Sequence, residues 1–174
     1  MVRTVLAING STRASSSNGH YLHAIERLVG DRAAFVRSPS ISDLPHFSPD
    51  LDHEDPPASV VHFRQLVLAS DVVLICTPEY AMGVVGSLKN ALDWLVSSSS
   101  LSGKPVMLVT ASLSGEKGHA ALLETLTVIE ARLRPETNVL IPFAKTKVTS
   151  DGVITDDPAL QAIQNALDVL LAGR

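Results

Sequence analysis

Five side chains that can bind a phosphate group lie close together near the start of the chain. They are Ser11, Arg13, Ser16, Ser17 and Asn18. Residues 4–8 before them form an uninterrupted apolar run, typical of a strand buried on both faces. Apolar residues then recur at three- and four-residue spacing through 22–29, which predicts an amphipathic helix. The loop therefore precedes a helix N-terminus, where unpaired N–H groups and the helix dipole stabilise an anion.

The arginine of this loop favours phosphate among the possible anions. The planar guanidinium of Arg13 can donate two hydrogen bonds at once to phosphate oxygens. A second interpretation is that Ser16 or Ser17 only caps the helix while the other serines fill a solvated loop. Capping does not account for Arg13. The loop has neither the spaced glycines of a dinucleotide-binding motif nor the Gly-Lys-Ser/Thr of a phosphate loop.

Two further loops consist largely of small residues and follow apolar runs. Residues 77–86 contain Tyr80, an aromatic surface, and residues 112–119 contain Ser112, Ser114 and Gly115, which let backbone approach a ligand. The carboxyl ends of parallel strands lie at one sheet edge, so all three loops can line one pocket. A ligand with one phosphate and a flat polar ring system would use all of them. Flavin mononucleotide (FMN) is such a ligand.

Three residues near these loops have simpler interpretations. Tyr80 can be a half-buried packing residue, since tyrosine often lies partly inside a protein. Cys76 ends an apolar run and is predicted to be a small apolar filler, not a nucleophile. His119 can face the pocket, but a lone histidine is usually not catalytic. The other histidines lack the spacing of metal ligands, so no metal site is predicted.

Composition limits the class of protein. With 174 residues, 45% of them hydrophobic and 18% charged, residues 1–174 are expected to form a single globular domain. A net charge of −4 and the lack of a basic run argue against nucleic-acid binding. One cysteine allows no internal disulfide. No apolar stretch is long enough to cross a membrane and the first strand begins at once, so a cytoplasmic protein is expected.

Five predicted strands alternate with five predicted helices. The strands are expected at 4–8, 33–37, 71–76, 104–111 and 138–141, and the helices at 22–29, 60–67, 87–98, 122–133 and 157–170, the last capped by Asp157. The proline-rich segment 38–57 is expected to be an ordered loop, and Asp151-Gly152 a tight turn. Parallel strands need crossover helices, so this alternation predicts a doubly wound α/β sandwich.

Several motifs together resemble one known family. They are Gly10-Ser11-Thr12-Arg13 followed by Ser16 and Asn18, Thr77-Pro78-Glu79-Tyr80, Gly86-Ser87-Leu88-Lys89-Asn90-Ala91-Leu92-Asp93-Trp94, and the loop Leu44-Pro45-His46-Phe47-Ser48-Pro49-Asp50-Leu51. This combination resembles the NADPH-dependent FMN reductase family. The resemblance implies a flavodoxin-like three-layer sandwich, with helices on both faces of a five-stranded parallel sheet, and bound FMN. It implies a phosphate held by Ser11, Arg13, Ser16, Ser17 and Asn18, and an isoalloxazine ring bordered by Pro78, Glu79, Tyr80, Ala81, Ser112, Leu113, Ser114 and Gly115.

The chain departs from that family at two places. Many members have asparagine after the tyrosine and proline before the glycine, where this chain has Ala81 and Val85. Members also often have a Gly-Gly-x-Arg stretch in the third loop, where this chain has Gly118-His119-Ala120. Losing that arginine leaves the preference between NADPH and NADH open.

The resemblance implies an NAD(P)H-dependent oxidoreductase. Hydride would pass from a nicotinamide nucleotide through FMN to a small-molecule acceptor such as free flavin or a quinone. Because the cofactor carries this chemistry, no catalytic side chain is expected. Backbone N–H groups of the second and third loops are expected to stabilise negative charge on the reduced ring. The alternatives are a non-catalytic FMN electron carrier and a redox-responsive binding module without turnover.

Self-association is a further implication of the resemblance, since related proteins are commonly dimers or tetramers. Trp94 lies off the apolar stripe of its predicted helix, so it is predicted to be exposed in a monomer and to anchor such an interface. Lys89 and Asp93 are predicted to form a solvated pair four residues apart on the same helix.

Overall fold

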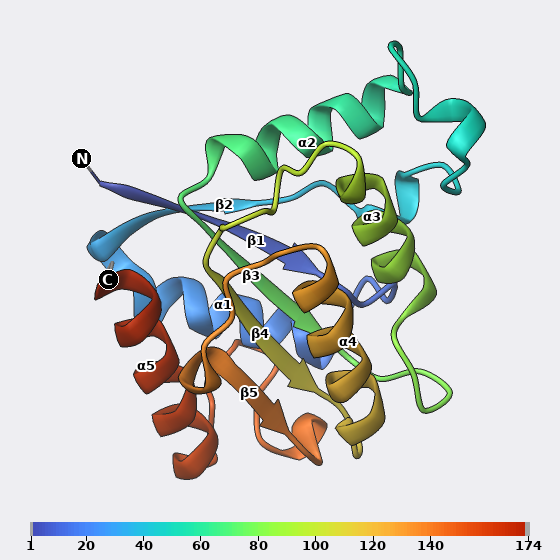
Figure 1. Ribbon diagram of the computed structural model, residues 1–174. Coiled ribbons are helices and arrows are strands. Elements are labelled where there is room, and N and C mark those ends of the chain that lie inside the picture. Colours follow the sequence, from blue (N-terminus) through green and yellow to red (C-terminus); the bar gives the residue numbers. More distant parts are fainter. Residues whose placement is uncertain (1, 173–174) are drawn as a thin grey trace.

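Five strands form one parallel sheet in the computed structural model, which describes residues 2–172 (Figure 1). They are β1 (Arg3–Asn9), β2 (Ala33–Arg37), β3 (Val72–Thr77), β4 (Val106–Ala111) and β5 (Asn138–Ile141), in the spatial order β2-β1-β3-β4-β5. β3 and β4 are buried along their whole length, because both faces are covered, and this explains their almost wholly apolar sequences. The strand order reverses beside β1, as in flavodoxin-like folds. The predicted parallel α/β fold is confirmed.

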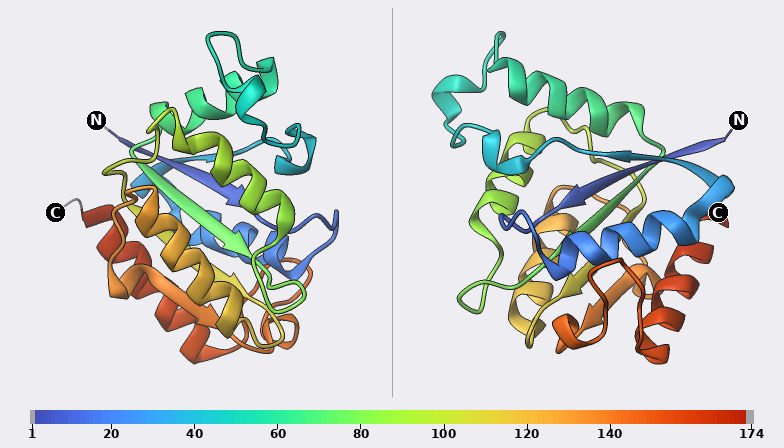
Figure 2. Two further views of the ribbon diagram at one scale, coloured as in Figure 1. Left: turned by 45° about the vertical axis from the view of Figure 1, so that its right-hand side comes forward. Right: turned by 180° about the vertical axis from the view of Figure 1, so that it is seen from behind.

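Helices cover both faces of the sheet and complete a three-layer sandwich (Figure 2). They are α1 (Ser17–Val29), α2 (Ala58–Ala69), α3 (Gly86–Val96), α4 (Glu116–Val128) and α5 (Asp157–Ala172). α1 and α5 bury their apolar stripes against one face, and α2, α3 and α4 bury theirs against the other. Within residues 2–172, no helix combines the length and the hydropathy that a transmembrane span requires.

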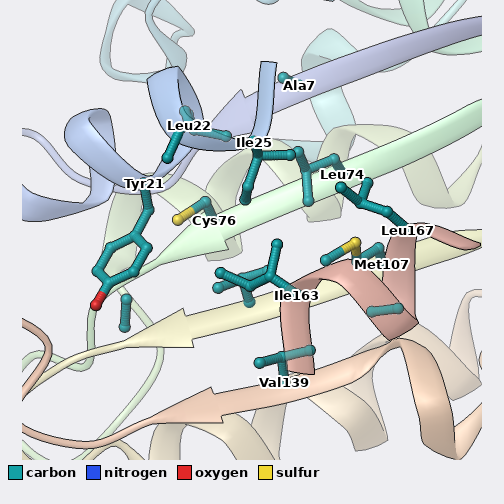
Figure 3. Packing of buried hydrophobic residues seen from close by; sticks show 14 of the residues in the cluster. Ala7, Tyr21, Leu22, Ile25, Leu74, Cys76, Met107, Val139, Ile163 and Leu167 are labelled. Carbon is teal, nitrogen blue, oxygen red and sulfur yellow. The ribbon is translucent and has the colours of Figure 1, made fainter. Parts of the chain in front are cut away.

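The core beneath α1 and α5 links this helix pair to the sheet edge where the strands end (Figure 3). Tyr21 of α1 is fully buried, and its hydroxyl donates to the carbonyl of Ala144 at 3.1 Å. Cys76, near the end of β3, is also fully buried, and its thiol donates to Oδ1 of Asn18 at 3.4 Å. Burial raises the pKa of the Cys76 thiol far above its usual value. Cys76 is therefore a packing residue, as predicted.

The prediction that Trp94 is exposed is wrong. Trp94 is fully buried, and its indole N–H donates to the carbonyl of Pro45 at 2.8 Å. Its ring meets Phe47 edge to face, with centroids 5.1 Å apart, and the guanidinium of Arg64 lies 5.8 Å from its centroid. The loop before α2 folds over this side of α3 and covers the indole. Trp94 therefore stabilises the fold and is not available as an interface anchor.

Three predicted helix ends are also corrected. The fourth helix is predicted to reach 133 but ends at Val128. Glu130 adopts a left-handed backbone conformation (φ 61°), and the Arg132 N–H donates to the carbonyl of Lys104, just before β4, so the chain has already left the helix. Its beginning lies at Glu116, inside the predicted third loop. Asp156, not Asp157, caps α5, since its carboxylate accepts a 3.0 Å hydrogen bond from the Ala159 N–H.

Two smaller predictions are confirmed. The Asp151-Gly152 turn joins two short extended pieces, which pair through an antiparallel bridge between Val148 and Ile154. Lys89 and Asp93 form an ion pair of 2.6 Å on the outer face of α3.

Candidate functional site

A cavity of about 670 Å³ opens at the carboxyl ends of the strands. This volume is in the range of small-molecule sites. Most of the predicted site residues line it, namely Ser11, Arg13, Ser16, Ser17, Asn18, Pro78, Glu79, Tyr80, Ser112 and Leu113. Ala81, Ser114 and Gly115 lie outside its lining. The three loops therefore converge on one space, as the strand order requires.

The first loop is held close to the sheet by the absence of a side chain at Gly10. The Gly10 N–H donates to the carbonyl of Cys76 at 2.8 Å. A Cβ atom at Gly10 would lie 2.3 Å from Oγ1 of Thr77, far inside van der Waals contact. The Ser11 N–H then donates to Oδ1 of Asn9 at 3.0 Å, which turns the chain toward α1. These contacts fix the loop before any ligand is present.

The N-terminus of α1 has the features of an anion site. Its first turn contains no acidic residue. Ser16 is the cap, because its hydroxyl accepts a 3.1 Å hydrogen bond from the Gly19 N–H, and the capping interpretation is therefore correct for Ser16. The buried Asn18 side chain donates to the Ala111 carbonyl at 3.1 Å. These two side chains serve the fold, which leaves the first N–H groups of α1 and the neighbouring Arg13 for a ligand.

The N-terminus of α4 is different, because carboxylates already occupy it. Oε2 of Glu79 accepts a 2.6 Å hydrogen bond from the Gly118 N–H, and Oε1 accepts one of 3.3 Å from the Gly115 N–H. Glu116 adds a second acid in the first turn. The Glu79 N–H in turn donates to Oγ of Ser112 at 3.1 Å. Glu79 therefore fastens the second loop to the third, and of these two helix N-termini the one that favours a ligand anion is that of α1.

The N–H groups of the second and third loops are expected to face a flavin ring, and several of them have partners within the protein. The N–H groups of Glu79 and Gly115 are used within the protein. Tyr80 and Gly83 exchange backbone hydrogen bonds with each other. Within residues 2–172, the N–H groups of Leu113 and Ser114 have no hydrogen-bond partner. These two remain as donors for a ligand in the third loop.

Tyr80 opens a tight turn with an unusual backbone. The two central residues, Ala81 and Met82, have φ angles of 47° and 59°. Left-handed angles at both positions are typical of a type I′ turn, which favours asparagine and glycine. The Tyr80 side chain is 40% exposed in the cavity wall, and its hydroxyl lies 3.5 Å from Oγ of Ser11. The turn thus presents an aromatic ring to the cavity at a cost in backbone strain.

Replacing Ala81 with asparagine should relieve part of this strain. The free energy of unfolding is expected to rise by about 0.5–1 kcal/mol, because asparagine tolerates the left-handed region better than alanine. Urea denaturation measures the change. Ala69→Asn is the control, since Ala69 is exposed and has no positive φ. Equal effects of the two substitutions would contradict strain at Ala81.

His119 lies beneath the third loop, outside the cavity lining. Its Nδ1 is 2.8 Å from Oγ1 of Thr110, which is fully buried near the end of β4. Burial lowers the pKa of His119. The histidine therefore packs against the sheet as a neutral ring and is not placed to act on a ligand.

The lowered pKa of His119 predicts that this residue makes the folded protein less stable in acid. The unfolded chain binds a proton at His119 near pH 6.5, whereas the folded protein resists it until lower pH. The stabilisation of the folded state by neutral His119 is therefore complete above about pH 6.5 and is lost as the pH falls below this value. In His119→Asn, the free energy of unfolding should fall less between about pH 7.5 and pH 5 than in the wild type. If the free energy of unfolding falls equally in the variant and the wild type over this pH range, the ring of His119 is not buried in its neutral form.

The cavity has a fourth wall that was not predicted from the sequence. It is formed after β5 by Phe143, Ala144, Lys145, Thr146, Val148 and Ser150, while Ser15, His20 and Ala111 add to the other walls. The position of this segment was implicit in the topology, because β5 ends at the same edge as the other strands. Apolar, basic and hydroxyl side chains alternate in this segment, so its composition does not distinguish it from an ordinary connection.

Comparisons with known proteins agree with this geometry. The sequence profile of the NADPH-dependent FMN reductase family matches residues 3–146. The chain is 33% identical over 172 residues to the NAD(P)H-dependent FMN reductase of Pseudomonas aeruginosa, over 95% of this chain and 92% of that one. It is 29% identical over 170 residues to the quinone reductase of Escherichia coli, over 94% and 90% of the two chains.

A solved structure extends the similarity to three dimensions. The flavoenzyme NAD(P)H:(acceptor) oxidoreductase FerB from Paracoccus denitrificans superposes with a TM-score of 0.81 and 29% identity, over 98% of this chain and 96% of that one. The match of the family profile begins at β1 and ends after β5, and so includes the three loops that follow β1, β3 and β4. The chain therefore belongs to the NADPH-dependent FMN reductase family.

Proposed function

We propose that residues 1–174 form one FMN-binding domain that passes hydride from NADPH or NADH through FMN to a small-molecule acceptor. The observation that carries this proposal is the cavity itself. It joins an anion site, with Arg13 and no acid in the first turn of α1, to an aromatic wall at Tyr80. One phosphate and one flat ring fit these two features.

The residues divide into those that hold a ligand and those that shape the cavity. Ser11, Arg13 and Ser17 would contact the phosphate with their side chains. Ser16 and Asn18 would contribute through the backbone, since their side chains serve the fold. Pro78, Tyr80, Ser112 and Leu113 would border the ring, and Glu79 would position its two loops. Ala81, Ser114 and Gly115 would act through the shape of their turns, with the Ser114 N–H as a further donor.

Bound FMN would supply the ability to accept and donate hydride. The protein's part is to hold the ring at an open edge of the sheet, where a nicotinamide nucleotide and then an acceptor can reach it in turn. Within residues 2–172, the titratable groups in the cavity wall are Arg13, His20, Glu79, Tyr80 and Lys145, and Glu79 is engaged with α4. No side chain is therefore assigned as an acid or base.

The acceptor, assembly and location are parts of the same proposal. A quinone or free flavin is the proposed acceptor, and the name of the Escherichia coli relative supports the quinone. A homodimer or homotetramer is proposed from the exposed apolar side chains of Leu113 and Phe143 in the cavity wall and of Met82 in the second loop. Light scattering tests this, and a monomer at all concentrations would exclude it. The proposed location is the cytoplasm.

One assay separates the enzyme from its alternatives. The purified protein is mixed with FMN, desalted, and tested for retained yellow colour and for oxidation of NADPH and NADH with a quinone present. Retained flavin with turnover supports the reductase. Retained flavin without turnover would show a carrier, and neither would leave a binding module.

A further inference from the structure

The fourth wall of the cavity places a second cation in the site. Lys145 lines the cavity at the start of the short helical turn η5 (Ala144–Thr146). We propose that Lys145 is a ligand for a phosphate monoester bound in this cavity. This inference rests on the proposed function, because it assumes that phosphorylated ligands enter here.

The backbone that carries Lys145 is fixed on two sides. The Ala144 N–H donates to the carbonyl of Ser112 at 2.9 Å, and the Phe143 N–H donates to the carbonyl of Leu113 at 3.0 Å. The carbonyl of Ala144 accepts the hydroxyl hydrogen of Tyr21, one turn along α1 from the anion site. The backbone next to Lys145 is therefore fixed by hydrogen bonds to both the third loop and α1.

Lys145 is free to bind an anion, whereas a neighbouring lysine is not. Lys145 is exposed and forms no ion pair within residues 2–172. Lys147, two residues along, lies 3.6 Å from the carboxylate of Asp156 and outside the cavity lining. The one carboxylate in the wall, Glu79, accepts two N–H groups of α4 and does not compete for Lys145.

The charge of a phosphate monoester that is fully ionised exceeds what the first loop supplies. Such a group carries about −1.5 to −2 at pH 7. Arg13 contributes +1 and the α1 N-terminus the equivalent of roughly +0.5. A second cation completes the neutralisation, and lysine binds phosphate well as a point charge. The cavity wall holds Lys145 for this role.

Two phosphate monoesters can enter this cavity under the proposed function. One is the 5′-phosphate of FMN, and the other is the 2′-phosphate that distinguishes NADPH from NADH. The binding arm titrates flavin-free protein with FMN and with riboflavin, which lacks the phosphate. The kinetic arm compares KM for NADPH and NADH. Each arm contains a control ligand that lacks the phosphate monoester, riboflavin in the first and NADH in the second.

The test uses Lys145→Met, with Lys147→Met as the matched control and Lys145→Arg as the variant that keeps the charge. Lys145→Met should weaken binding of FMN or of NADPH about tenfold, without changing the binding of the control ligand that lacks the phosphate monoester. Lys147→Met should leave both arms unchanged, and Lys145→Arg should restore most of the loss. Thermal unfolding confirms that all three variants are folded.

The outcomes separate the inference from the proposed function. If only the affinity for FMN falls, Lys145 binds the cofactor phosphate. If only the KM for NADPH rises, Lys145 binds the 2′-phosphate of the nucleotide. Unchanged affinities in Lys145→Met, or equal losses for FMN and riboflavin with no NADPH effect, would overturn the inference while FMN binding by the wild type upholds the proposed function. A wild-type protein that binds no FMN would overturn both.

Discussion

Replacing Arg13 with alanine is expected to weaken FMN binding about 10- to 150-fold, the loss of roughly 1.5–3 kcal/mol from a charge-assisted hydrogen bond. Arg13 lines the cavity beside the α1 N-terminus and forms no ion pair within residues 2–172. Its guanidinium is therefore available to phosphate without first breaking another contact. Fluorescence titration of flavin-free protein with FMN measures the effect.

Two controls isolate the phosphate contribution of Arg13. Riboflavin should bind Arg13→Ala and the wild type equally, because it carries no phosphate. Arg37→Ala removes the same charge from the surface, where Arg37 pairs with Glu26 at 2.6 Å, and should not affect FMN. If Arg13→Ala binds FMN as the wild type does, Arg13 does not bind the phosphate.

Replacing Gly10 with alanine is expected to damage both the fold and the site. The added Cβ would lie 2.3 Å from Oγ1 and 2.5 Å from Cβ of Thr77, a buried residue at the end of β3. The clash can be relieved only if β1 and β3 move apart, which would move the first loop away from the sheet. The free energy of unfolding should fall by about 3 kcal/mol or more, and retained FMN should be lost.

Gly86→Ala is the matched control for this substitution. Nothing lies within 4 Å of a Cβ at Gly86, which is the first residue of α3 and has no positive φ. Its stability should change little or rise slightly, because alanine has the better helix propensity. A Gly10→Ala protein as stable as Gly86→Ala would show that β1 and β3 do not meet as described.

The sheet and its loops could be predicted because their causes are local. Apolar runs such as Val72–Thr77 require burial on both faces, and parallel strands bring their carboxyl ends to one edge. Convergence of the three loops follows from that rule without any knowledge of side-chain contacts. The segment after β5 obeys the same rule, but its mixed composition did not distinguish it from an ordinary connection.

The failures depended on contacts between distant residues. Trp94 lies off the stripe of α3 that packs on the sheet, and only the path of the loop through Pro45 and Phe47 decides that it is covered. The roles of Ser16 and Asn18 were open for a similar reason, because either residue type can serve a ligand or the fold. Their hydrogen bonds to Gly19 and Ala111 show that both side chains stabilise the fold, and their contact with a ligand stays a prediction.

A crystal structure of the protein with FMN would test the central claim most directly. We predict the phosphate at the N-terminus of α1 beside Arg13, and the ring against Tyr80 and Leu113. A phosphate at α4, where the Glu79 carboxylate lies, or a flavin outside the cavity would contradict the account.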